Sequence, residues 1–142
     1  MSFLQDLFAV GTFSSAQASW ALLVFRVVVA IIFFVHAYQK LHYWKTHHAD
    51  VIPKTTLALY RVSSCYEFAA SVAILLGLYT HIAVIGLLII IVGAIYTKQV
   101  VWRKHFTGEG GWEFDAILLA SLIVLFFFGS GNYSLDHRFF GI

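Results

Sequence analysis

The sequence predicts an all-α integral membrane protein, a four-transmembrane-helix bundle with a short N-terminal interfacial helix. Hydrophobic residues make up 61% of its 142 residues and charged residues only 11%, whereas soluble proteins contain about 25% charged residues. Crossing a bilayer requires about 20 apolar residues of helix. Four stretches come close to this length, and together they form one domain over residues 1–142: residues 20–38, 57–78, 81–102 and 112–129.

The first segment predicts a short helix lying on the membrane surface, because its apolar residues recur at helical spacing: Phe3, Leu4, Leu7, Phe8 and Val10. The four spans that follow are continuous apolar runs, which favour helices over the alternating pattern of a barrel. Only Tyr79 and Thr80 separate the second span from the third, so these two helices are expected to form an antiparallel hairpin.

Positive charges indicate how the bundle is oriented. Lys and Arg are concentrated around residues 39–56 and 103–111, whereas the N-terminal tail has none and the C-terminal tail has only Arg138. Positively charged connections tend to stay in the cytoplasm. We therefore expect both connections to be cytoplasmic and both termini to lie outside.

Two ionisable residues are expected deep in the membrane. Arg26 lies about 9 Å below the outer end of the first span and Glu67 about 16 Å below the outer end of the second, from a helical rise of about 1.5 Å per residue. An unpaired Arg costs several kcal/mol in lipid. The sequence therefore predicts an ion pair between Arg26 and Glu67, either as part of a site or only to hold the two helices together.

Further polar residues converge on the cytoplasmic ends of the predicted helices: His36, Gln39, Lys40, Lys98, Glu113 and Asp115. The first three occupy positions i, i+3 and i+4 and so share one helix face. Together these residues predict one polar cluster that binds a ligand or handles protons. The alternative, favoured for Lys40 and Lys98 taken singly, is that their side chains extend to the lipid headgroups. For His36 and Glu113 the functional interpretation is favoured.

Several other classes of site are not expected. Cys65 is the only cysteine, which excludes an internal disulfide and a multi-cysteine metal site. A haem would need histidines that face each other at similar depth, and His36 has no such counterpart. No metal site is predicted, and the net charge of +2 is too small for a nucleic-acid surface.

Small residues predict close helix packing in the third span. Gly86 and Gly93 lie seven residues apart, which places them on one side of the helix. Glycines of this kind let neighbouring backbones approach in a membrane. Both are therefore expected at a helix contact.

The run from Arg26 to Leu41, which includes His36, Gln39 and Lys40, resembles the first helix of the DoxX family of four-helix membrane proteins. The resemblance covers the chain from about Trp20 onward, and its other matching segments are Glu67, Gly77-Leu-Tyr-Thr80, Gly111-Trp-Glu113 and the run from Gly129 to Asp136. It implies an inner-membrane protein related to the small subunit of a terminal quinol oxidase and of thiosulfate:quinone oxidoreductase. Asp115 departs from the family pattern, in which an apolar residue or Pro is usual, and adds a negative charge beside Glu113.

The resemblance implies a membrane subunit associated with quinone-linked redox or oxidative-stress chemistry. A quinone-like amphipathic molecule would bind among the polar residues named above, and Glu67 would pass protons. No residue is identified as catalytic, and any enzyme activity would depend on a partner. Besides the lipid bilayer, the expected partner is another membrane or redox subunit or a second copy of the chain. The alternative is a small transporter or a non-catalytic scaffold or assembly subunit.

Overall fold

A computed structural model describes residues 15–46 and 54–141, and every regular element in these ranges is helical. In chain order these are α2 (Ser15–Thr46), α3 (Lys54–Leu76), α4 (Thr80–Tyr96), the π-helical turn η1 (Thr97–Val101), α5 (Glu113–Phe128) and the short α6 (Leu135–Phe140). The predicted all-α class is confirmed. The predicted interfacial helix falls on residues 1–14, outside the described ranges.

Three of the described helical segments are long and apolar enough to cross a membrane: Ala16–His42, Leu57–Leu76 and Thr80–Val101. The fourth expected span corresponds to α5, which has 16 residues. At about 1.5 Å per residue, α5 reaches about 24 Å, which is less than the hydrocarbon thickness of about 30 Å. The helix lengths thus support three spans directly.

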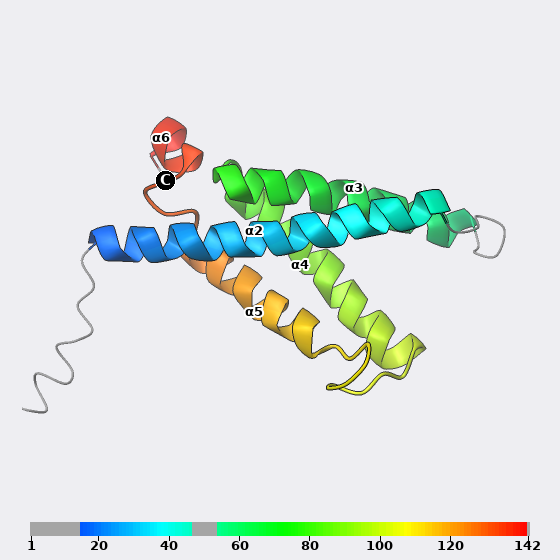
Figure 1. Cartoon of the computed structure of the whole chain (residues 1–142). Coiled ribbons are helices and arrows are strands. Elements are labelled where there is room, and N and C mark those ends of the chain that lie inside the picture. Colours follow the sequence, from blue (N-terminus) through cyan, green and yellow to red (C-terminus); the bar gives the residue numbers. More distant parts are fainter. Residues whose placement is uncertain (1–14, 47–53, 142) are drawn as a thin grey trace, which may run out of the picture.

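The long helices are arranged as two pairs. Figure 1 shows α2 and α3 side by side, with α4 and α5 forming a second pair that crosses the first. The hairpin predicted between the second and third spans is confirmed, because α3 and α4 are joined by a turn of three residues, 77–79. Gly77 and Tyr79 both adopt left-handed backbone conformations in this turn, with φ of 64° and 50°.

The helices bury small and aliphatic residues between them and expose apolar residues outward. The core includes Ala30, Ile74, Leu87 and Leu122, whereas the outer surfaces carry large apolar residues such as Ile89. A soluble protein would present a polar face on the side of each helix opposite the core. Apolar residues all around these helices indicate lipid as the surrounding solvent.

The two ends of the bundle differ. At one end, called here the C-terminal end, the 77–79 turn meets the segment 129–141. At the other, called here the cavity end, α2 and α3 lie away from η1 and the start of α5, as Figure 1 shows. This second end contains most of the ionisable residues discussed below.

Candidate functional site

A cavity of about 690 Å³ lies at the cavity end between the two helix pairs, and its wall includes residues from α2, α3, α4, η1 and α5. Its polar and ionisable lining residues are His36, Lys40, Tyr60, Ser63, Glu67, Thr97, Lys98 and Asp115. The rest of the wall is mostly apolar or aromatic, including Phe33, Ile91, Tyr96 and Trp102. An apolar cavity with a few converging polar groups is the usual form of a small-molecule site.

One wall of the cavity holds an ion pair between α2 and α3. Lys40 Nζ donates to Glu67 Oε1 at 2.6 Å. The Glu67 side chain is only 2% exposed and that of Lys40 is 35% exposed. The other carboxylate oxygen, Glu67 Oε2, is buried and has no hydrogen-bond partner among the described residues. Because a buried carboxylate oxygen without a donor is costly, this atom is the strongest indication of a missing ligand group.

The predicted ion pair between Arg26 and Glu67 is wrong. Arg26 is buried at the C-terminal end, where its guanidinium donates to the carbonyls of Ser130 at 2.6 Å and Tyr133 at 2.8 Å. The physical reason is that the segment after α5 folds back over the bundle and supplies acceptors at the depth of Arg26. Glu67 meanwhile finds a nearer cation in Lys40.

The opposite wall of the cavity holds a second ion pair. Lys98 Nζ donates to Asp115 Oδ2 at 2.5 Å and to the carbonyl of Gly111 at 3.3 Å. Lys98 lies in the π-helical turn η1, and single π-helical turns are frequent at functional sites because they change the direction of a side chain. Asp115 thus serves as the counter-charge of Lys98.

His36 lies on the cavity wall between these charges. Its ring stacks on that of Phe114 from α5, with centroids 5.6 Å apart and planes 13° from parallel. It lines the same cavity as the four charged groups of the two ion pairs. An imidazole in this position can donate or accept a hydrogen bond toward the cavity.

The structure therefore brings together most of the predicted site residues but not all of them. His36, Lys40, Glu67, Lys98 and Asp115 line the same cavity. The remaining three do not: Arg26 is at the other end, and Gln39 and Glu113 are exposed outside the lining. Gln39 and Glu113 are each close in sequence to lining residues, and helical rotation places their side chains away from the cavity.

Sequence reasoning missed several lining residues. Phe33 and Ser63 lie within predicted spans and carry no charge that would single them out. Phe33 does have one signal, because it lies three residues before His36 and so shares its helix face. Trp102 is the last residue of the third predicted span, and the structure adds it to the lining.

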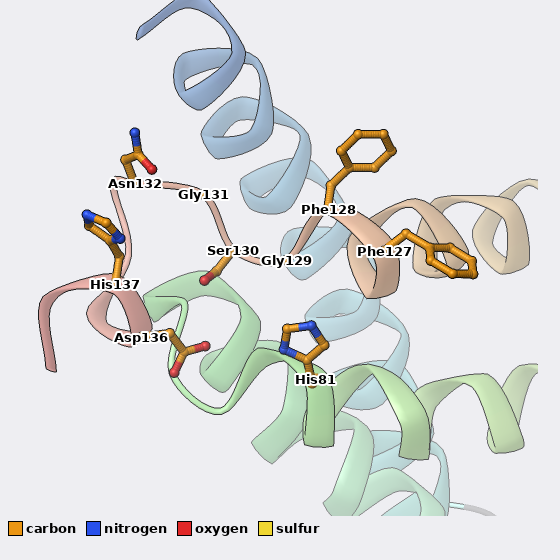
Figure 2. A pocket seen from close by; sticks show the side chains of 9 residues that line it. All are labelled: His81, Phe127, Phe128, Gly129, Ser130, Gly131, Asn132, Asp136 and His137. Carbon is orange, nitrogen blue, oxygen red and sulfur yellow. The ribbon is translucent and has the colours of Figure 1, made fainter. Parts of the chain in front are cut away.

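The C-terminal end has a smaller pocket of about 220 Å³, which includes His81, Asp136 and His137 in its lining. Figure 2 shows the Asp136 carboxylate close to the start of α4. Its two oxygens accept from the backbone N–H groups of Tyr79 at 2.7 Å and Thr80 at 2.9 Å. Asp136 thus caps the N-terminus of α4 from a distant part of the chain, where a carboxylate also suits the helix dipole.

Arg26 and Gly77 secure the same end. The guanidinium of Arg26 lies so close to Gly77 that a Cβ at this position would collide with it and with Ser134. The backbone N–H of Asp136 also donates to the carbonyl of Gly77 at 2.7 Å. These contacts hold the C-terminal end of the bundle closed.

No group of three potential metal ligands occurs among the described residues.

A comparison with models of known protein families supports the family resemblance seen in the sequence. The model of one protein family, DoxX, matches residues 21–99, which is more than half of the chain. The matched region contains Arg26, His36, Lys40, Glu67 and Lys98. No curated protein and no solved structure matches the chain. The chain belongs to the DoxX family.

Proposed function

We propose that this protein is a membrane subunit that binds a quinone-like amphipathic molecule in the cavity between its two helix pairs, with Glu67 as the group that exchanges a proton with it. The observation that carries the proposal is Glu67 Oε2, a buried carboxylate oxygen that has no partner within the described chain and belongs to a cavity-lining residue. A hydroxyl of a reduced ring would supply the missing donor.

The other groups of the cavity suit the rest of such a molecule. Lys40 Nζ uses one hydrogen bond for Glu67 and, with three N–H donors, can offer another to a ring oxygen. His36 offers a second donor or acceptor on the same helix face. The volume of about 690 Å³ lies within the range of about 300–1,000 Å³ typical of ligand pockets.

The charges in the cavity favour a neutral ligand. Lys40 is paired with Glu67, and Lys98 is paired with Asp115. The two ammonium groups are therefore neutralised where they stand, and an anionic headgroup would gain little from them. A quinone or its reduced form carries no net charge and has both acceptor and donor oxygens.

A bound quinone would supply two-electron redox chemistry, and the chain's own residues would bind and orient the ring and hold a proton at Glu67. The electrons would pass to or from a partner redox subunit. In this proposal α5 is the fourth span of an inner-membrane bundle, and the cavity end faces the cytoplasm. The positions of Arg103 and Lys104 in the loop at that end support this orientation.

The test is ligand binding to the purified protein in nanodiscs, with a decyl-substituted benzohydroquinone kept reduced as the probe. Glu67→Gln should weaken binding by about tenfold or more, since a hydrogen bond to a charged group contributes about 1.5–3 kcal/mol. Glu109→Gln is the matched control, because Glu109 is exposed in the loop before α5, and it should bind as the wild type does.

Three outcomes would reject the proposal. The first is wild-type binding no greater than the partition of the probe into empty nanodiscs. The second is an unchanged affinity in Glu67→Gln that retains its helical circular dichroism. The third is pH-dependent flux of a polar solute through proteoliposomes without probe binding, which would indicate a transporter instead.

A further inference from the structure

The cavity opens on a particular side of the bundle. Three of its lining residues, Leu59 of α3, Tyr96 at the end of α4 and Val101 of η1, are 70%, 60% and 63% exposed. All three belong to segments that are long and apolar enough to span a membrane. The rim they form is therefore mostly apolar and belongs to helices whose length and composition suit a lipid environment.

Two glycines of α4 show where the contact between α3 and α4 is closed and where it is open. A Cβ at Gly86 would collide with the ring and hydroxyl of Tyr66 from α3, and that hydroxyl donates to the carbonyl of Ile82 at 2.9 Å. A Cβ at Gly93 would meet no heavy atom of the described chain within 4 Å. The close contact predicted for both glycines is thus confirmed at Gly86 and wrong at Gly93.

Gly93 lines the same cavity as Glu67 and Lys40. The cavity is therefore continuous from the polar groups to an unobstructed position on α4. Toward the C-terminal end, two helical turns away at Gly86, Tyr66 closes the path. The opening between α3 and α4 thus lies on the Gly93 side of Tyr66.

We infer that the ligand carries a single long apolar chain, which leaves the cavity between α3 and α4 at Gly93, and that the ligand enters sideways from the bilayer. The inference rests on the proposed function and names the shape of its ligand: a neutral polar ring joined to one chain. Gly93 is then a specificity-determining position, because the side chain that it lacks would occupy the path of the chain. The occupant is the ligand's own chain rather than that of a phospholipid, since both ammonium groups that could hold a phosphate are already paired.

The test compares two reduced probes in nanodiscs, a benzohydroquinone with a decyl chain and the same ring with a methyl group in place of the chain. Gly93→Leu should lower the affinity for the decyl probe by about tenfold or more, from about 0.8 kcal/mol for each methylene that loses its apolar surroundings. The affinity for the short probe should stay within twofold. Gly93→Leu is expected to fold, because leucine has a higher helix propensity than glycine.

Ala120→Leu is the matched control. Ala120 is exposed on α5 and does not line the cavity, so the same added bulk should change neither affinity. Equal losses for both probes in Gly93→Leu, or no loss for either, would overturn the inference while leaving the proposed function intact. A phospholipid retained by the wild type and lost from Gly93→Leu in native mass spectrometry, with the affinity for the decyl probe unchanged, would also overturn it. Failure of the wild type to bind either probe would instead reject the proposed function, and the inference with it.

Discussion

Removing Lys40 tests the pairing that defines the cavity. Lys40→Met leaves Glu67, which is 2% exposed, without the ammonium that lies 2.6 Å away. Breaking a buried ion pair in this way costs about 3–5 kcal/mol. Because the Lys40 side chain is 35% exposed, the pair is partly solvated, and we expect a loss of about 3 kcal/mol in the free energy of unfolding.

The reverse replacement should cost less. In Glu67→Leu the ammonium of Lys40 can extend toward the interface, so the expected loss is about 1–2 kcal/mol. The double variant Lys40→Met with Glu67→Leu removes both charges and should be more stable than the sum of the two losses predicts. Neighbouring charges of this kind usually show a coupling energy of about 0.5–3 kcal/mol, and we expect about 2 kcal/mol here.

The assay is reversible unfolding in mixed micelles with increasing sodium dodecyl sulfate, followed by circular dichroism of the helices. A second cycle with Arg26→Met and Glu67→Leu is the internal control. Arg26 bonds to Ser130 and Tyr133 at the opposite end of the bundle, so this cycle should be additive within about 0.5 kcal/mol. Additive losses for Lys40 and Glu67, together with coupling between Arg26 and Glu67, would refute the assignment of partners.

Replacements at the C-terminal end and along α4 test the remaining contacts. Arg26→Met should release the segment after α5, because two carbonyls lose their donor, and limited proteolysis in proteoliposomes should cut there faster. Asp136→Ala should lower the unfolding free energy by about 1–2 kcal/mol through loss of the cap on α4, and a midpoint equal to the wild type in the micelle assay would contradict the cap. Gly86→Leu should destabilise the α3–α4 contact, because the added side chain would collide with Tyr66. Gly93→Ala should instead stabilise α4 by about 1 kcal/mol. A higher unfolding midpoint for Gly86→Leu than for Gly93→Ala would contradict this difference.

Much of the architecture could be predicted because lipid imposes simple requirements on a chain. Backbone groups in a bilayer must be satisfied within a helix or a closed barrel, so continuous apolar runs identify helices with little ambiguity. The two residues between the second and third spans left no room for anything but a hairpin. The length of α5 was overestimated, since the predicted fourth span of 112–129 includes Trp112 and Gly129 and the helix contains only Glu113–Phe128.

The candidate site was predicted in composition more successfully than in its pairing. His36 and Lys40 share a helix face by spacing alone, and both line the cavity. Gln39 obeys nearly the same spacing and yet is exposed outside it. A difference of one residue rotates a side chain by about 100° around the helix, so the result depends on how the helix is turned against its neighbours.

The sequence by itself determined the apolar surroundings, the helical class and the position of each charge along its own helix, because these follow from composition and from the rise of a helix. The tertiary structure decided which charges meet. Glu67 pairs with Lys40 because α2 and α3 face each other at that depth, and Arg26 finds carbonyls only because the chain after α5 folds back. It also decided that Gly93 borders open space while Gly86 is covered. Depth along an axis can be counted from residue numbers, whereas rotation about that axis and the return of a distant segment are set by packing.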